Sequence, residues 1–388
     1  MIYDFDTLPE RRVTESFKWN AYPEDVLPMF VADMDFTSPQ PVIDALQRRV
    51  AHGVFGYPGG MLHELPDLKQ TLIERMQRLY GWAIQAEDIL IVPGLVTALN
   101  QAVQACVPPG GGVLVQTPVY PPFLTLAKSA GVLDQRVGLH RDELTGRVSV
   151  DGFAFEAALK AETRMFVLCN PHNPVGRAFQ RDELERMAEA CLRHKVLICS
   201  DEIHCDLVYS GSRHIPIASL DPEVAQNTIT LMAPSKTYNI AGLECSVAII
   251  PNPELRQKYQ EASRGLVGWV NIMGLVAAQA AYAYGQEWLE QLLVYLEANR
   301  DFLYDYLQRQ LPAIRMVKPE ATYLAWLDCS GLFLREDPYE FFLREARVAF
   351  NRGSTFGQGG EHFVRLNFGC PRSVLFEALE RVRAALGG

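Results

Sequence analysis

Residues 181–204 read RDELERMAEACLRHKVLICSDEIH, a stretch that decides the fold class of this chain. Residues 181–193 place apolar side chains at the spacing of one helix face, which predicts an amphipathic helix. That face consists of Leu184, Met187, Ala188 and Cys191. The apolar run 196–200 predicts a buried strand, and Asp201 follows it directly. A helix leading into a buried strand is typical of an α/β layer architecture.

Short apolar runs of the same kind recur through the middle of the chain and alternate with amphipathic runs. The further strand candidates are Gly112–Gln116, Met165–Cys169, Thr228–Met232 and Ser246–Ile250. Such alternation predicts a mainly parallel sheet flanked by helices.

The pattern changes beyond about residue 285. A long amphipathic run over Glu287–Gln310 precedes two strand-like segments, Thr322–Leu327 and Phe363–Phe368, each followed by a helical run. This part of the chain resembles a separate, smaller α+β lobe. The predicted division is a large domain over residues 48–288 and a small domain made of residues 1–47 and 289–388.

The composition of the 388 residues fits a folded enzyme, with 48% hydrophobic and 21% charged residues. Disordered and collagen-like chains are excluded by these fractions. The 36 Lys and Arg residues against 46 Asp and Glu residues give a net charge of −10, which would repel a phosphate backbone. We therefore expect no nucleic-acid partner.

The first residues, MIYDFD, lack the basic and apolar regions of a signal peptide, so we expect a cytoplasmic protein. The apolar segment 274–284 is shorter than the run of about 18 residues that a membrane span requires, and it predicts a buried helix. The 8 cysteines include no C-x-x-C pair and lie mostly in apolar runs. We interpret them as reduced core residues and predict no metal site.

Two charged side chains directly follow predicted strands. Asp201 follows the strand at 196–200, and Lys236 lies just after the strand at 228–232. In open α/β sheets, ligands bind at the carboxyl ends of the strands. Each residue also has a plainer interpretation, as a lysine that reaches solvent or as an aspartate that caps a turn.

Two loops could hold a ligand rigidly. The loop Asn170–Gly176 contains two X-Pro dipeptides, which stiffen the mount of the Asn173 amide. The segment Pro93–Thr97 leads into a predicted helix over residues 98–106, whose free N–H groups would suit a phosphate. A simple turn and an ordinary helix start are the alternatives.

Two further side chains are unusual in their settings. Tyr120 stands between prolines in the segment 116–123, a stiff mount for a ring that stacks on a flat ligand or packs in the core. Arg365 lies among apolar neighbours in the segment 363–367. A buried arginine needs a carboxylate partner, which either the protein or a ligand could provide.

In this order, the segments resemble fold-type I pyridoxal-5′-phosphate (PLP) enzymes of the aminotransferase class I/II superfamily. The nearest resemblance is to the carbon–sulfur lyase group, which comprises MalY/PatB-type cystathionine β-lyases and the cystalysins. The resemblance extends over essentially the whole chain, through Phe30–Phe36, Gly56–Pro58, Asn170–Gly176, Ser200–Tyr209, Ser235–Gly242 and Val364–Asn367. It implies a homodimer that shares each active site across the interface.

The resemblance implies a role for each matching residue. Lys236 would bind PLP as a Schiff base and later remove the substrate Cα proton, and Asp201 would keep the pyridine nitrogen cationic. Asn173 would contact the phenolic oxygen O3′, and Tyr120 would stack on the ring. Arg365, together with Asn173, would orient the substrate through its α-carboxylate.

The phosphate of PLP would bind at the predicted helix start. The resemblance assigns it to the backbone N–H groups of Val96 and Thr97 and to the Ser235 hydroxyl. Tyr57 would reach the same phosphate from the neighbouring subunit.

Two positions depart from the aminotransferase pattern. Glu244 stands eight residues after Lys236, where many aminotransferases carry a phosphate-binding arginine. His204 stands three residues after Asp201, where a tyrosine often faces O3′, and it is included among the predicted cofactor contacts. The lyase group is similar to this chain at both positions.

The resemblance therefore implies a β-lyase that cleaves the Cβ–S bond of L-cystathionine or related S-substituted cysteines. The products would be a thiol, pyruvate and ammonia. An aminotransferase acting on a 2-amino acid remains an alternative. A regulatory or binding protein of the PLP fold, with incidental lyase activity, is the other.

Overall fold

The computed structural model describes residues 1–58 and 66–387. Within them, seven strands form one sheet in the order β2-β10-β9-β8-β7-β3-β4. These strands are β2 (Ile89–Val92), β3 (Gly112–Thr117), β4 (Leu133–Gly138), β7 (Thr163–Cys169), β8 (Leu197–Asp201), β9 (Thr228–Met232) and β10 (Ser246–Ile249). The neighbours from β9 to β4 pair in parallel, whereas β10 is antiparallel to both β9 and β2. The predicted α/β class with a mainly parallel sheet is confirmed.

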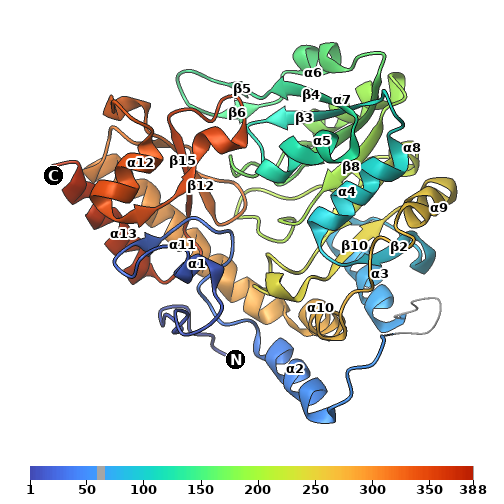
Figure 1. The fold of residues 1–388 in the computed structure, drawn as a ribbon, viewed down its shortest axis with the longest axis horizontal. Helices are drawn as coiled ribbons and strands as arrows, with labels where there is room; N and C mark the ends of the chain where they lie inside the picture. Colours follow the sequence, from blue (N-terminus) through green and yellow to red (C-terminus); the bar gives the residue numbers. More distant parts are fainter. Residues whose placement is uncertain (59–65, 388) are drawn as a thin grey trace.

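Helices cover both faces of this sheet (Figure 1). One face packs against α4 (Leu95–Cys106), α5 (Leu126–Ala130) and α9 (Pro253–Ala262), and the other against α6 (Gly152–Ala158), α7 (Arg181–Arg193) and α8 (Pro222–Gln226). In β3, Val113 and Val115 pack toward the first group and Leu114 toward the second. Side chains alternate between two covered faces, so the strands are continuous apolar runs in the sequence.

The C-terminal part contains a second sheet, antiparallel, in the order β11-β12-β15-β14. Its strands are β11 (Arg315–Met316), β12 (Leu324–Asp328), β14 (Asn351–Arg352) and β15 (Phe363–Asn367). It lies beside the helices α11 (Gln286–Gln310) and α13 (Arg372–Ala385) (Figure 1). The predicted strand 322–327 begins later, at Leu324, because Thr322 adopts a positive φ of 69°.

The N-terminal segment joins this C-terminal part through β1 (Leu27–Pro28), which pairs with β13 (Val348–Ala349). The remaining elements are α1 (Phe17–Asn20), α2 (Gln40–His52), α3 (Pro66–Tyr80), β5 (His140–Arg141), β6 (Val148–Ser149), α10 (Ile272–Tyr284), α12 (Pro338–Phe341) and short 3₁₀ or π turns. The predicted domain boundaries at 47/48 and 288/289 fall inside α2 and α11, and the division itself remains a prediction.

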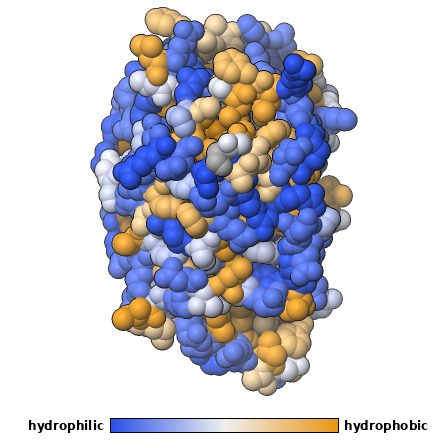
Figure 2. Space-filling model, turned by 90° about the vertical axis from the view of Figure 1, so that its left-hand side faces the viewer, coloured by the Kyte–Doolittle hydropathy of each residue, from blue (hydrophilic) through white to orange (hydrophobic). Residues whose placement is uncertain are grey.

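The surface that carries the C-terminal helices is mixed, with hydrophobic side chains in separate groups among hydrophilic ones (Figure 2). No helix in the described ranges is long and apolar enough to span a bilayer. All eight cysteines are free thiols. Seven of them are buried, and Cys106 is partly exposed.

Candidate active site

The parallel strands bring the predicted residues to one edge of the large sheet. Asp201 ends β8, and its neighbours β7 and β9 lead into the loops that carry Asn173 and Lys236. Tyr120 follows β3, and its backbone N–H donates to the carbonyl oxygen of Asn173 at 3.1 Å. Strands that run in the same direction end at the same edge, so residues far apart in the sequence meet there.

A cavity of about 200 Å³ opens at this edge. Its lining includes eight of the predicted residues: Val96, Thr97, Tyr120, Asn173, Asp201, His204, Ser235 and Lys236. Arg365 lies next to the cavity wall, where its Nη1 donates to Asn173 Oδ1 at 2.8 Å. Within one chain, Tyr57 is the predicted residue that does not reach this site.

Lys236 has an amine whose proton affinity is lowered by its surroundings. Its Nζ donates to the carbonyl oxygen of Ala32 at 2.7 Å. Burial, with the nearby positive charge of Arg365, lowers the pKa of Lys236 to about 8, although Asp33 and other carboxylates act in the opposite direction. An amine with this pKa can both accept and release a proton near neutral pH.

Asp201 is an acidic group in a poorly solvated place. It is 4% exposed, and its Oδ1 accepts a hydrogen bond from the Ile203 N–H at 3.1 Å. Burial raises the pKa of Asp201 to about 7, and the negative charge of Glu202 adds to the increase. A cationic ligand group beside Asp201 would therefore be strongly favoured.

This raised pKa predicts a pH-dependent stability of the cofactor-free protein. The folded state binds the proton of Asp201 more tightly than the unfolded chain, so the stability from this group is present below about pH 4 and is lost as the pH rises through about 7. Asp201→Asn, which cannot ionise, should unfold a few degrees higher than wild type at about pH 8 but not at about pH 4. Thermal unfolding followed by circular dichroism checks this, and a pH-independent difference would contradict it.

Arg365 is a buried cation without an acidic partner in the described part of the chain. It is 3% exposed, and its Nη2 donates to the carbonyl oxygen of Phe30 at 3.0 Å and to the Asn351 side chain. Its Nε has no partner. Burial lowers the pKa of Arg365 to about 10, which leaves it cationic at neutral pH. A cation in this state fits a carboxylate supplied by a ligand.

The N-terminus of helix α4 forms a potential anion-binding site in the same cavity. The first helical bond is made by the Ala98 N–H, so the N–H groups of Leu95, Val96 and Thr97 have no partner within the helix. The helix begins at Leu95 and not at Ala98 as predicted, because Gly94, with a φ of 82°, redirects the chain just before it. The earlier start places Val96 and Thr97 in the first turn, where an anion binds best.

Glu244 lies beside this N-terminus of α4. A Cβ added at Gly94 would collide with Glu244 Oε2, so the carboxylate covers the residue that precedes the helix. The charge of Glu244 also contributes to the raised pKa of Tyr120 and opposes the lowering of the Lys236 pKa. An anion bound at the N-terminus of α4 would be repelled by this carboxylate.

We therefore expect Glu244→Gln to tighten the binding of a phosphate-bearing cofactor. Because Glu244 is exposed, the gain should be about three- to tenfold at low salt and should shrink as salt is added. Fluorescence titration of the cofactor-free protein with PLP measures the dissociation constant. A dissociation constant that is equal to wild type at low salt would place the phosphate elsewhere.

His204 is 2% exposed, and its Nδ1 has no hydrogen-bond partner. Burial and the nearby positive charges of Lys236 and Arg365 lower the pKa of His204 to about 3, so the ring is neutral. An unpartnered buried nitrogen at a cavity wall suits a ligand oxygen or hydroxyl group. The predicted contacts of His204 and Tyr120 with a cofactor remain predictions.

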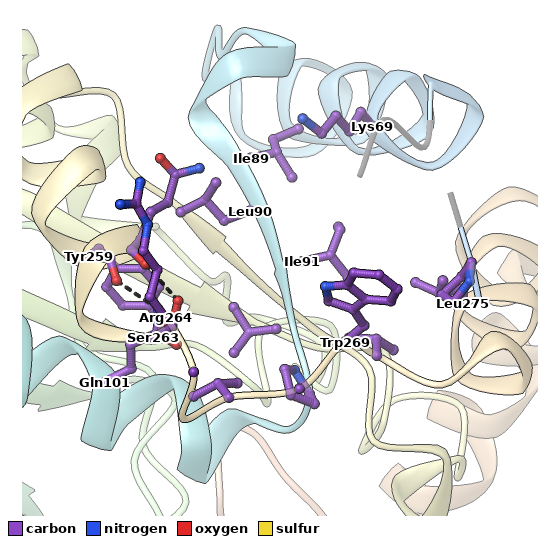
Figure 3. A pocket seen from close by; sticks show the side chains of 18 of the residues that line it. Lys69, Ile89, Leu90, Ile91, Gln101, Tyr259, Ser263, Arg264, Trp269 and Leu275 are labelled. Carbon is purple, nitrogen blue, oxygen red and sulfur yellow. Dashed lines mark hydrogen bonds between the residues drawn. The ribbon is translucent and has the colours of Figure 1, made fainter. Parts of the chain in front are cut away.

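Tyr57 lies outside the cavity. It is 87% exposed, and its ring contacts that of Trp269 at a centroid distance of 5.1 Å. Trp269 borders another cavity, of about 630 Å³, which runs beside β2 past Ile91 and Leu275 (Figure 3). This larger cavity contains none of the predicted site residues.

Three contacts of the site were missed by the sequence analysis. The carbonyl oxygens of Ala32 and Phe30 accept from Lys236 and Arg365, and a backbone acceptor has no sequence signal. Asn351 faces Arg365 because β14 pairs with β15 in that register. The sequence signal that could have indicated the contact between Asn351 and Arg365 is a polar residue next to an apolar strand.

The fold and this site define a class of protein. Residues 24–382 match the aminotransferase class I and II family, and the chain belongs to that family.

Individual proteins are similar to this chain over nearly their full lengths. Cystathionine beta-lyase PatB of Bacillus subtilis (strain 168) is 41% identical, over 99% of this chain and 100% of the relative. Cystalysin from Treponema denticola, whose crystal structure contains a pyridoxal 5′-phosphate cofactor, is 34% identical with a TM-score of 0.95, over 100% of this chain and 99% of that chain. The structure of a protein named OvoB is 44% identical with a TM-score of 0.92, over 99% of both chains.

Proposed function

We propose that this protein is a PLP-dependent carbon–sulfur β-lyase that converts L-cystathionine or a related S-substituted cysteine to a thiol, pyruvate and ammonia. The observation that carries the proposal is the convergence of Lys236, Asp201 and Asn173 on one cavity, with Arg365 bonded to Asn173. The full-length similarity to PatB and to cystalysin supports the same reaction.

The residues present fit PLP. The free N–H groups at the start of α4 and the Ser235 hydroxyl would hold its phosphate, and Asp201 would face its ring nitrogen. His204, with its unpartnered Nδ1, could contact the ring substituents. When bound, PLP supplies a cationic conjugated ring that withdraws electrons from the substrate Cα.

The chain's own residues would perform the remaining tasks. Arg365 and Asn173 bind the α-carboxylate and orient the substrate. The Lys236 amine, with its lowered pKa, would take the proton from Cα. The Cβ–S bond would then break with its electron pair on sulfur, and the Lys236 ammonium could return the proton to the sulfur so that a thiol departs. Asp201 stabilises the positive charge on the ring nitrogen throughout.

Arg365→Lys should mainly weaken substrate binding. The variant keeps the positive charge but loses the planar fork, so we expect KM to rise about tenfold with a much smaller change in kcat. Arg352→Lys on the neighbouring strand, where the arginine is paired with Glu340 at the surface, is the matched control. An unaltered KM in Arg365→Lys would remove Arg365 from the carboxylate site.

We also propose that two copies of the chain form a homodimer in the cytoplasm, each contributing Tyr57 to the other's phosphate site. Exposed apolar side chains support this: Val54 and Phe55 precede Tyr57 in the sequence, and Leu266 precedes Trp269, whose ring contacts that of Tyr57. Packing of these side chains against a second copy of the chain would remove this apolar surface from water. Sedimentation velocity should give twice the mass of one chain, and a monomer would contradict the shared site.

The test of function uses two reactions. The protein loaded with PLP is mixed with L-cystathionine, and separately with L-alanine plus 2-oxoglutarate, and thiol, pyruvate and glutamate are measured. The β-lyase should release thiol and pyruvate in equal amounts from the first mixture and form no glutamate in the second. Glutamate without thiol would indicate an aminotransferase, and neither product would favour a regulatory or binding protein.

A further inference from the structure

A buried acid–base pair lies directly behind Asp201. Successive side chains of a strand point to opposite faces, so Ser200 and Glu202 face away from the cavity that Asp201 faces. Glu202 is 0% exposed, and its Oε2 lies 2.6 Å from the Nε2 of His214, whose side chain is 1% exposed. The proposed function assigns no task to either residue.

Three donors converge on the Glu202 carboxylate. Besides His214 Nε2, the Ser200 hydroxyl donates to Oε1 at 2.8 Å, and the Ile217 N–H donates to Oε1 at 3.3 Å. This arrangement suits a carboxylate anion and ties the turn after β8 to the segment 214–217. A buried carboxylate requires a compensating positive charge, and His214 is the ionisable side chain that contacts it.

The charge of Glu202 influences the pKa of Asp201 in the candidate active site. Its negative charge contributes to the raised pKa of Asp201, which precedes it in the chain. The ring of Tyr80 packs edge-on against His214 at 5.6 Å. The neighbouring ionisable groups are Cys205 and the Arg75–Asp206 ion pair, whose charges cancel.

We propose that Glu202 and His214 form a positioning pair, in which the histidine offsets the charge of Glu202 and so keeps Asp201 ionised beneath the ring nitrogen of the cofactor. The inference rests on the proposed function, because Asp201 needs a negative charge only if it faces a cationic ring. Neither residue touches the substrate or the cofactor. The pair acts through the position and charge of Asp201.

The test compares the PLP-loaded, substrate-free protein with variants that remove the charge of Glu202, of His214, or of both. Glu202→Gln removes the negative charge and keeps the shape, so every titrating group in the site should lose its proton at lower pH. The visible absorbance of the bound cofactor should then change at a pH about one unit below wild type. His214→Gln leaves Glu202 without its offset and should move the same transition at least about half a unit upward.

The double variant separates charge from structure. With Glu202 already neutral, the added His214→Gln change removes the offsetting positive charge as well, so the double variant should bring the transition back close to the wild-type pH. His194→Gln is the matched control, because His194 pairs with Glu156 on the surface before β8, and it should titrate as wild type does. Thermal unfolding of each variant shows whether the fold is retained.

The outcomes distinguish this inference from the proposed function. A wild-type protein that fails to bind PLP or to cleave L-cystathionine would overturn the function. A wild-type protein that does both, with all variants folded and titrating at the wild-type pH, would overturn only the positioning pair. If His214→Gln shifts the transition downward, the histidine does not offset the charge of Glu202, and the proposal is wrong.

Discussion

Lys236→Ala should abolish the lyase reaction, with a loss of at least about a thousandfold, because it removes both the covalent attachment of the cofactor and the base for the Cα proton. The amine of Lys236 contacts Ala32 in the cavity and has a pKa near 8, which makes it the lysine suited to both tasks. Thiol release from L-cystathionine and the visible absorbance of the protein measure the two losses separately.

Lys258→Ala is the matched control for this variant. Lys258 is exposed on α9 and does not line the cavity, so its removal should change neither signal. If Lys236→Ala retained the covalent cofactor absorbance or more than about a hundredth of the wild-type rate, another residue would perform these tasks.

Asp201→Asn should lower kcat by at least about a hundredfold, because a neutral amide cannot stabilise the positive charge on the ring nitrogen. The amide can still accept the hydrogen bond that the Ile203 N–H donates, so the local turn should persist. The measurement is kcat for thiol release under saturating PLP and substrate. Asp201→Glu, which restores the charge with a longer side chain, should recover part of the activity.

A structural role of Asp201 would give a different result. In that case Asp201→Asn would unfold at lower temperature at every pH, and its kcat would remain within a few-fold of wild type. The raised pKa of Asp201 instead predicts a cofactor-free variant that is more stable than wild type above neutral pH but far less active. Activity and stability would thus change in opposite directions.

The sequence predicted the large sheet well because its strands are covered on both faces and appear as apolar runs. The strand β4 (Leu133–Gly138) was missed, since it lies at the sheet edge with mostly exposed side chains and lacks such a run. The start of α4 was placed three residues late. The apolar pattern does not indicate that Gly94 adopts a positive φ and ends the preceding turn.

The site was predicted where residues follow strands directly. Asp201 and Lys236 could be placed at the same sheet edge because their strands are parallel neighbours. The contacts from Ala32 and Phe30 could not be predicted, because they come from the N-terminal segment and involve backbone atoms. The pair formed by Glu202 and His214 depends on a loop whose path the periodicity does not determine.

The measurement that tests the central claim most directly is reduction of the PLP-loaded protein with borohydride, followed by mass spectrometry of its peptides. Lys236 lines the cavity, and in the described part of the chain Lys18 is a buried lysine whose amine forms an ion pair with Asp35 at 2.7 Å. The account predicts that the cofactor's mass is found on the peptide containing Lys236, and that prior addition of L-cystathionine reduces this labelling. Labelling of Lys18 or of a surface lysine, or no labelling at all, would contradict it.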